Sequence, residues 1–332
     1  MAIHFRRRAF LGALGGTAVV WPVAARAQQP GVPVIGYLGA GWPDASANLV
    51  AAFRKGLSEV GYVEGRNVTI DFRWAHNEND RLPNLAADLV RRGVQVIVTQ
   101  ATTLAASTAK AATTSIPVVF GIGADPVRAG LVASFNRPGG NVTGVTTMSI
   151  ELMPKRLGLL QELLPKATRF AVLVNPTNPV GAELATADAR ATAAAIGRQV
   201  EVFGARSNAD IDEVFAALVR NRVEAIAFTP DALFDDRRVQ LATLAARHQL
   251  PALHWKREFA EVGGLMSYGS NVADVFRQTG NYAGRILNGD RPADLPVLRA
   301  TKFEFVVNLQ TAKTIGIEMP PDLLALADEV IE

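Results

Sequence analysis

Residues 120–145 read "FGIGADPVRAGLVASFNRPGGNVTGV", and this stretch decides how the chain is interpreted. The apolar run that enters it, "IPVVFGIG" (116–123), has the length and β-branched content of a buried strand. The run stops before Asp125-Pro126, and a second strand-like run follows only after "RPGGN". Two interpretations of Asp125 stay open. It caps a helix whose first residue is Pro126, or it lies at the mouth of a cleft and meets a ligand.

The same alternation of apolar and amphipathic runs extends in both directions from this stretch. Further strands are predicted at 32–39, 67–75, 94–100, 169–176, 199–205, 223–230, 250–255, 263–269 and 301–316. Helices are predicted at 46–62, 81–93, 103–115, 153–165, 181–198, 209–221, 236–249 and 272–289. The strands are nearly continuous in Val and Ile, which is typical of parallel sheets covered by helices on both faces.

The alternation restarts near residue 150, so we predict an α/β protein of two doubly wound, parallel-sheet lobes with a hinged cleft. The Gly- and Pro-rich segment "RPGGNVTGVTT" (137–147) is typical of a crossover between them. We assign residues 33–146 plus 266–298 to an N-terminal lobe. Residues 147–265 plus 299–332 form the C-terminal lobe in this prediction.

The first 27 residues, "MAIHFRRRAFLGALGGTAVVWPVAARA", have the pattern of a secretory signal peptide. Three arginines precede a short apolar run, and small residues at Ala25 and Ala27 suit a signal peptidase. The apolar run is too short to span a membrane as a mature helix. "RRAFL" (7–11) also fits the twin-arginine export pattern. We therefore expect export across the inner membrane to the periplasm.

Charge and cysteine content exclude several classes of protein. The 332 residues carry a net charge of +3, and residues 1–27 contain four arginines and no acid, so the mature chain falls to −1. A nearly neutral chain lacks the basic surface that nucleic-acid binding requires. There is no cysteine, so lipid anchoring through cysteine, disulfides and cysteine metal sites are excluded. The four histidines have no metal-ligand spacing, and we expect no cofactor.

Candidate ligand-binding residues are those that follow the predicted strands, because open parallel sheets bind ligands at the carboxyl ends of their strands. They are hydroxyls, amides, carboxylates and aromatics that suit a small polar solute: Trp42, Thr102, Thr103, Asp125, Asn175, Thr177, Asn178, Asp231, Trp255 and Tyr268. A structural role stays open for several of them. Asp125 and Asp231 fit helix caps, Thr102 and Thr103 fit helix starts, and the tryptophans fit ordinary partly buried aromatics.

Four segments together resemble one family. They are "AFRKGLSEVGYVEGRNVTIDFRWA" (52–75), "IPVVFGIGADPVRAGLVASFNRPGGNVTGV" (116–145), "GGLMSYGSN" (263–271) and "KFEFVVNLQTAKTIGI" (302–317). They are similar to the ABC-transporter substrate-binding proteins related to tryptophan- and tyrosine-binding proteins. The resemblance covers essentially all of the mature chain.

The resemblance implies a type I periplasmic-binding-protein fold with three crossovers and a ligand in the cleft. It further implies a monomer that delivers a small solute, such as an amino acid or an aromatic acid, to an ABC permease in the inner membrane. Family positions that hold an amino acid match Thr103, Asp125, the loop 175–178 and Asp231. Ala124 and Pro230 depart from the pattern of the aromatic amino-acid binders, so the resemblance does not name the solute.

Two other classes of protein share part of this pattern. A ligand-sensing regulator of the lactose-repressor type shares the two-lobe core, but it needs a helix-turn-helix where this chain has an export signal. A secreted α/β enzyme needs a nucleophile and a base, and no G-x-S-x-G elbow or P-loop occurs. "DDRR" (235–238) is interpreted as a solvated helix start rather than as a carboxylate pair.

Overall fold

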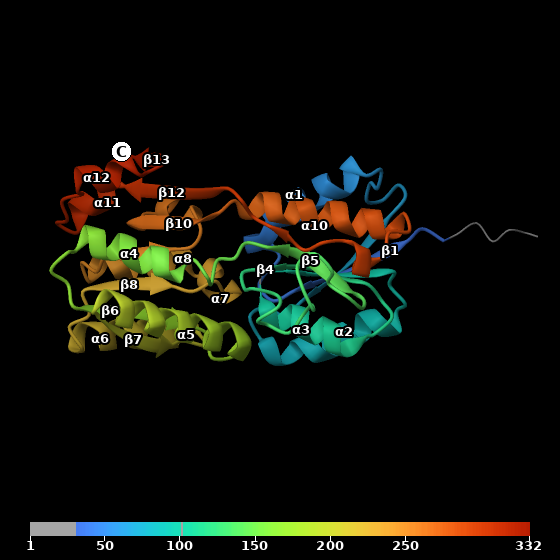
Figure 1. Ribbon diagram of the computed structural model, residues 1–332, viewed down its shortest axis with the longest axis horizontal. Helices are drawn as coiled ribbons and strands as arrows, with labels where there is room; N and C mark the ends of the chain where they lie inside the picture. The colour runs from blue at the N-terminus through green and yellow to red at the C-terminus, as the bar shows by residue number, and fades with distance from the viewer. Residues whose placement is uncertain (1–30, 101) are drawn as a thin grey trace, which may run out of the picture. The chain divides into compact units, whose positions relative to one another are not determined.

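The computed structural model describes residues 31–100 and 102–332, which fold as two α/β lobes, each built on its own sheet (Figure 1). Within the described residues the first sheet has six strands and the second has seven. Neighbouring strands run parallel throughout, except that β10 and β12 of the second sheet are antiparallel. The predicted fold class is confirmed. The predicted signal peptide lies outside the described residues.

The first sheet takes its strands from two separate parts of the chain, residues 34–146 and 298–299. In spatial order they are β11 (Leu298–Arg299), β5 (Val142–Thr146), β4 (Val118–Ile122), β3 (Val96–Gln100), β1 (Val34–Gly39) and β2 (Thr69–Trp74). The helices of this lobe are α1 (Ala47–Glu59), α2 (Leu82–Arg91), α3 (Thr103–Ala112) and α10 (Val272–Leu287), with short 3-10 turns η1 (Asp44–Ser46), η2 (Asn79–Arg81) and η3 (Pro292–Asp294).

The second sheet repeats the plan, except that β12 and β13 run antiparallel to its other strands. In spatial order its strands are β13 (Glu329–Ile331), β12 (Phe303–Asn308), β10 (Met266–Ser270), β9 (Ala252–His254), β8 (Ala225–Phe228), β6 (Arg169–Val174) and β7 (Gln199–Gly204). Its helices are α4 (Met153–Leu163), α5 (Pro179–Ile196), α6 (Asn208–Arg220), α7 (Ala232–Asp236), α8 (Arg238–Arg247), α9 (Glu258–Glu261), α11 (Leu309–Thr314) and α12 (Pro321–Ala325).

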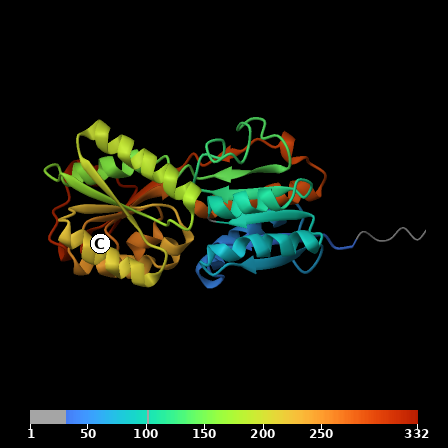
Figure 2. The ribbon, with the colours of Figure 1, turned by 90° about the horizontal axis from the view of Figure 1, so that it is seen from below.

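Helices cover both faces of the first sheet (Figure 2). Helices α1 and α10 pack on one face through residues such as Phe53 and Tyr282, and α2 and α3 pack on the other. Two glycines let α1 and α10 approach closely. A Cβ on Gly56 would lie 1.8 Å from the carbonyl oxygen of Arg277, and one on Gly280 would lie 2.1 Å from that of Phe53. These positions therefore require glycine.

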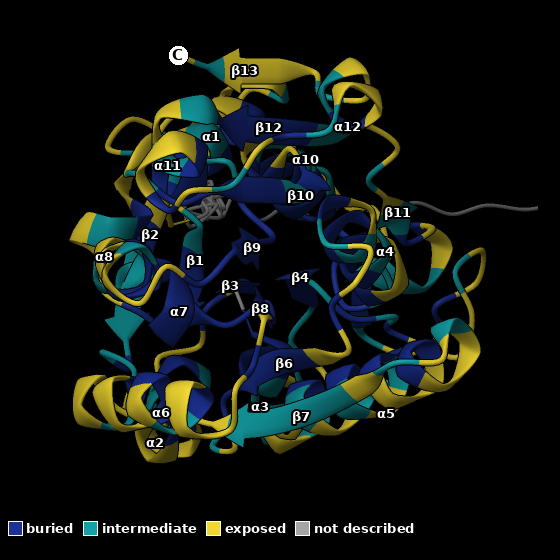
Figure 3. Cartoon of the chain, turned by 90° about the vertical axis from the view of Figure 1, so that its left-hand side faces the viewer, coloured by how far each residue is buried: buried dark blue, intermediate teal, exposed yellow. Residues whose placement is uncertain are grey.

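The second sheet is likewise buried between layers. Its central strands are buried, while helices α5, α6 and α8 turn exposed faces outward (Figure 3). One face packs against α6 and α8 around Phe215 and Phe259, and the other packs against α4 and α5 around Leu160 and Phe170. This layering explains why the strands read as continuous apolar runs in the sequence.

Three crossovers join the sheets. The chain passes from β5 to α4 through residues 147–152, from β10 to α10 at Asn271, and from β11 to β12 through residues 300–302. We expected residues 266–298 in the first lobe, but β10 pairs with β9 and β12 of the second sheet. The crossing therefore comes after β10, because the Asn271 side chain accepts a hydrogen bond from the Asp274 amide and starts α10 there.

Only the first half of the predicted strand 301–316 forms a strand, and the second half forms a helix. Strand β12 ends at Asn308, whose side chain accepts a hydrogen bond from the Thr311 amide at 2.9 Å. That N-cap starts helix α11. The apolar residues after it, such as Ala312 and Ile315, are buried from a helix rather than from the sheet.

Candidate functional site

Loops at the carboxyl ends of the two sheets meet each other. After β2, Asn77 donates its side-chain amide to Asp236 Oδ2 at 2.8 Å, and Asp236 ends helix α7, which follows β8. Asn79 donates to Thr177 Oγ1 at 2.8 Å and to the Thr177 carbonyl at 3.2 Å, and Thr177 follows β6. These bonds join the lobes at the edge where open α/β sheets bind ligands. Neither Asn77 nor Asn79 was among the predicted site residues.

The lobes also approach closely at two glycines. A Cβ on Gly41 would lie 3.1 Å from Asp236 Oδ2, and one on Gly123 would lie 3.1 Å from the Cβ of Pro230. Gly41 follows β1 and Gly123 follows β4 in the first lobe, while Pro230 follows β8 and Asp236 ends α7 in the second. A Cβ at either position would crowd its neighbour in the other lobe.

Asp125 caps a turn rather than a helix. Its Oδ1 accepts from the Val127 amide at 2.7 Å and the Arg128 amide at 3.1 Å. The chain then turns at Gly130, which has φ +69°, instead of continuing as a helix. The expected helix from Pro126 is therefore wrong, because the left-handed glycine ends the first turn. Asp125 itself is half-buried and faces the segment that crosses to the second lobe.

That crossing segment supplies Glu151, which the sequence analysis missed. Glu151 Oε1 accepts from the Asp125 amide at 2.7 Å, while Oε2 is buried with no hydrogen-bond partner among the described residues. Burial raises the pKa of the Glu151 carboxyl. Arg128 Nη1 lies 3.9 Å from Glu151 Oε1. The Arg128 guanidinium also donates two hydrogen bonds of 3.0 Å to the Asp188 carboxylate of α5. This interaction is a further link between the lobes.

Four of the predicted residues of the second lobe, Asn175, Thr177, Asn178 and Asp231, form one hydrogen-bonded network. Asp231 accepts from the side-chain amides of Asn175 at 2.8 Å and Asn178 at 3.1 Å, and from the Leu233 amide at 3.0 Å. It therefore caps α7, as one of its two interpretations predicted. Burial raises the pKa of Asp231, and the three donors oppose that shift. Asn175 Oδ1 in turn accepts from the amide and hydroxyl of Thr177. The network fixes the loop that meets Asn79.

The threonines after β3 lie at the start of helix α3. Thr102 is its N-cap, and its hydroxyl accepts from the Ala105 amide at 3.1 Å. Thr103 is buried as the first helical residue, and its carbonyl accepts from the Ser107 hydroxyl at 3.0 Å. The helix-start interpretation is confirmed for Thr102. The same position also directs the free amides of α3 toward the edge of the sheet.

The aromatic candidates differ in their surroundings. Trp42 is 44% exposed and packs on His76, with the ring centroids 4.3 Å apart and the ring planes tilted by 33°. Trp255 is 4% exposed and joins an apolar cluster with Leu49 of α1 and Phe276 of α10. It thus reaches from the second lobe into the first. Tyr268 is half-buried and packs on Phe303 and Phe305 within the second lobe, with centroids 6.3 Å apart.

A buried ionic cluster lies next to Trp255. Asp235 Oδ2 pairs with Lys256 Nζ at 2.8 Å, and Asp235 Oδ1 lies 3.9 Å from His254 Nε2. Burial raises the pKa of Asp235 to about 7, against the attraction of Lys256. The interpretation of "DDRR" as a solvated helix start is wrong, because Asp235 is 8% exposed and Asp236 bonds across the cleft. The surrounding polar residues gave no apolar pattern that would have revealed this burial.

Arg156 of helix α4 was also missed. Its side chain is 0% exposed, and Nε donates to the Tyr268 carbonyl at 2.9 Å. Burial lowers the pKa of Arg156 to about 9. A solvent-facing arginine could occupy the same position of the helix, so the sequence pattern does not predict that Arg156 is buried.

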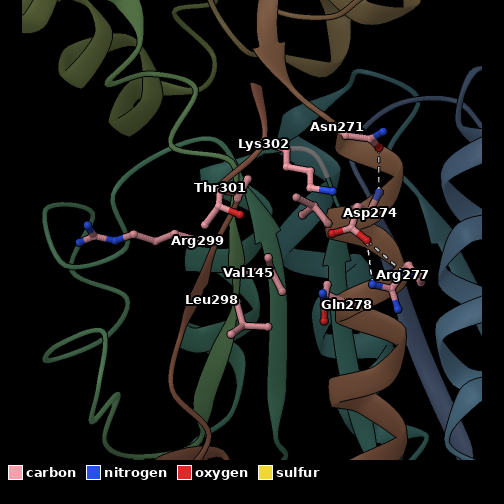
Figure 4. Close-up of a pocket in the computed structure, with 11 residues that line it drawn as sticks. Val145, Asn271, Asp274, Arg277, Gln278, Leu298, Arg299, Thr301 and Lys302 are labelled. Atoms are coloured by element: carbon pink, nitrogen blue, oxygen red, sulfur yellow. Dashed lines mark hydrogen bonds and ion pairs between the residues drawn. The ribbon is translucent and has the colours of Figure 1, made fainter. Parts of the chain in front are cut away.

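Several hollows adjoin the crossovers, and one of about 120 Å³ lies beside Trp255 and Asn271. Another, of about 10 Å³, lies between the lobes beside Gly123, Thr147, Pro230 and Trp255, and it has room for about one water molecule. A groove of about 450 Å³ lies between α10 and the β11–β12 crossover, where the side chains of Gln278, Thr301 and Lys302 border it (Figure 4). None of the predicted ligand residues lines this groove.

Metal-binding clusters and membrane-spanning helices are absent from the described residues. No group of three His, Cys, Asp or Glu side chains in residues 31–100 and 102–332 is placed to hold a metal ion. None of the helices in these ranges is both long enough and apolar enough to cross a membrane.

Comparison with known proteins places these features in a family. The family model described as "ABC transporter substrate binding protein" matches residues 43–331. The chain is 27% identical to the tyrosine-binding protein of Clostridioides difficile over 267 residues, which are 80% of this chain and 76% of that protein.

Two solved structures are similar over 90% of this chain and 99% of theirs, each at 26% identity. The ABC domain from Streptococcus pneumonia in complex with L-Trp has a TM-score of 0.80. A ligand-free, open substrate binding protein with adhesive properties from Clostridium difficile has a TM-score of 0.62. The type I periplasmic-binding-protein fold is thereby confirmed. The chain belongs to the ABC transporter substrate-binding protein family.

Proposed function

We propose that this protein captures an amino acid or a similar small acid between its two lobes and delivers it to the membrane permease of an ABC importer. The observation that carries the proposal is the meeting of polar loops from both sheets, through Asn77 with Asp236 and Asn79 with Thr177. Three crossovers join the lobes, so a small rotation about them can open and close this edge.

The two structural comparisons support a closing motion. At equal identity and coverage, the TM-score is 0.80 to the L-Trp complex and 0.62 to the ligand-free, open structure. The lobe contacts described above are those of a protein in the closed arrangement. The hollow of about 10 Å³ is too small for an amino acid. A ligand therefore enters an open form and rearranges the loops as the lobes close on it.

The amino-acid class is proposed from the relatives, which bind tyrosine and L-Trp. We further propose a monomer without a cofactor, exported to the periplasm by a signal at residues 1–27 and free of a lipid anchor. The role is binding rather than catalysis. His254 fits this role, because its ring is wholly buried and its Nδ1 accepts from the Lys256 amide at 3.0 Å.

Isothermal titration calorimetry of residues 28–332 against the twenty amino acids tests the proposal. We expect saturable, one-to-one binding of at least one of them, and L-tyrosine and L-tryptophan are the first to try. Binding of none of the twenty would contradict the amino-acid class.

The variant Asp125→Asn examines whether Asp125 meets the ligand. Asn keeps the cap on the Val127 and Arg128 amides but removes the charge. A lost charge-assisted bond to an ammonium should cost ~1.5–3 kcal/mol of binding, or roughly ten- to over a hundredfold in Kd. Asp322→Asn, on the exposed first turn of α12, is the matched control and should bind like the parent. Unchanged affinity in Asp125→Asn would leave Asp125 only a turn cap.

A further inference from the structure

Arg156 presents a charge that the protein leaves without a counter-ion. Its guanidinium is 0% exposed, and its Nη1 and Nη2 atoms have no hydrogen-bond partner among the described residues. No ion pair within 4 Å involves it in these ranges, although 17 others are present there. Burying a charge without a partner costs several kcal/mol. A purely structural arginine would satisfy more than the single bond from Nε to the Tyr268 carbonyl.

The position of Arg156 relates it to the space between the lobes. It lies in the first turn of α4, directly after the crossover 147–152 from the first lobe. Its partner Tyr268 lies two residues before Ser270, where β10 ends. The Ser270 hydroxyl lies 3.4 Å from the Thr147 carbonyl of the same crossover. Arg156 therefore lies beneath the segment that lines the closed edge, at the carboxyl end of the second sheet.

A carboxylate with one unsatisfied oxygen lies on the same crossover. Glu151 Oε2 is buried without a hydrogen-bond partner among the described residues, while Oε1 accepts from the Asp125 amide and lies 3.9 Å from Arg128. Arg156 and Glu151 attract each other, yet no ion pair joins them. The two groups thus present a positive and a negative site, five residues apart in sequence, to the same region. An α-amino acid carries the complementary pair, a carboxylate and an ammonium.

We propose that Arg156 binds the carboxylate of the amino-acid ligand with its two Nη groups, and that Glu151 Oε2 binds the ammonium beside Asp125. This assignment rests on the proposed function and adds the groups that recognise both ends of the ligand. The guanidinium fork matches a carboxylate with two parallel N–H···O bonds. The carboxylate of the ligand then neutralises the guanidinium charge of Arg156 when the lobes close.

Ligand analogues that lack one charged group provide the test. Calorimetry compares L-tyrosine with tyramine, which lacks the carboxylate, and with 3-(4-hydroxyphenyl)propionate, which lacks the ammonium. The variants are Arg156→Met, Arg156→Lys and Glu151→Gln. Arg169→Met is the matched control, because Arg169 is exposed and makes one bond to a backbone carbonyl, that of Asn221.

We expect Arg156→Met to weaken the binding of L-tyrosine and of the propionate at least ~10-fold, because a charge-assisted hydrogen bond is lost. The affinity for tyramine should stay within ~3-fold of that of the parent. Glu151→Gln should weaken L-tyrosine and tyramine but not the propionate. Arg156→Lys keeps the charge but loses the fork, so its loss should be intermediate. Arg169→Met should bind all three ligands like the parent.

The stability of the free protein separates recognition from a structural role. Arg156→Met removes an unpaired buried charge and nearly preserves volume, so the ligand-free Tm should stay the same or rise. A fall in Tm together with equal losses for all three ligands would overturn the assignment. So would parent-like binding of L-tyrosine by Arg156→Met. If Arg156→Met does not fold, Arg156→Lys serves as the test. The assignment is then overturned if Arg156→Lys binds L-tyrosine and tyramine with the same ratio of affinities as the parent.

The outcomes also distinguish this inference from the proposed function. If the parent binds an amino acid and the Arg156 variants bind it equally well, only the assignment of Arg156 is wrong. If the parent binds none of the twenty amino acids, the amino-acid ligand and the assignment are both wrong.

Discussion

Removing the hydrogen bond between Asn77 and Asp236 should weaken ligand binding without unfolding the protein. The bond joins the lobes at 2.8 Å, and its acceptor is a carboxylate whose pKa is raised by burial. A hydrogen bond to a charged group is worth ~1.5–3 kcal/mol. Asp236 is only half-buried and also accepts from the Trp42 amide, so water and that bond replace part of the loss.

We therefore expect Asn77→Ala to cost ~1–2 kcal/mol of closure, which is about 5- to 30-fold in Kd, mainly through faster dissociation. The assay is a double-mutant cycle with Asn77→Ala, Asp236→Ala and the double variant, measured by calorimetry with the tightest amino-acid ligand. The matched control is Asn221→Ala. Asn221 makes the same kind of bond at 2.8 Å, to Glu201, but wholly within the second lobe.

The reasoning predicts a coupling free energy of at least ~0.5 kcal/mol between the two positions. It also predicts parent-like affinity for Asn221→Ala and a free energy of unfolding that changes little in all four proteins. Additive effects of Asn77→Ala and Asp236→Ala, or an equal loss in the control, would refute the view that this bond holds the lobes together.

Three further predictions concern packing, charge and export. Gly280→Ala should lower the free energy of unfolding, measured in urea, by about 1–3 kcal/mol, because the added methyl group overpacks against α1. Gly158→Ala in α4, where a Cβ has open space, should raise it by up to ~1 kcal/mol. Equal effects of the two substitutions would contradict the close contact between α1 and α10. Burial raises the pKa of the Asp235 carboxyl in the folded protein to about 7. The contribution of this carboxyl to the free energy of unfolding is therefore full below its pKa in the unfolded chain, and it is lost as the pH rises to about 7. Asp235→Asn should thus gain stability relative to the parent between about pH 4 and 7, and a pH-independent difference in urea midpoints would show that the carboxyl is not buried as described. Replacing Arg7 and Arg8 by Lys should leave precursor in the cytoplasm, as detected by fractionation and immunoblotting, and normal export would reject the twin-arginine route.

The sequence determines much of the fold because both sheets are buried on two faces. Continuous Val- and Ile-rich runs such as those of β3 and β6 have no other stable placement than between layers of helices. The strand at β10 was predicted, but its lobe was not, because β10 pairs with β9 and β12 of the second sheet. Its pairing with β12 is antiparallel and long-range, so no local pattern announces it.

The candidate site was predicted in part, and the omissions have physical causes. Strand ends located Asn175, Asp231 and Asp125, because the topology places every loop after a parallel strand at one edge. Arg156 and Asp235 could not be found in this way. Each is a charged residue on a helix, and only the tertiary packing of α4 and α7 shows that their charges are buried. The ring of Trp255 packs between the lobes on α1 and α10, and its contact with a ligand stays a prediction.

A crystal structure of residues 28–332 with the tightest-binding amino acid tests the central claim most directly. The account predicts one solute molecule enclosed between the lobes, in contact both with the loops after β3 and β4 of the first sheet and with the loops after β6 and β8 of the second. It also predicts the Asn77–Asp236 bond in place. A solute that contacts one lobe only, or that occupies the groove between α10 and the β11–β12 crossover, would contradict it.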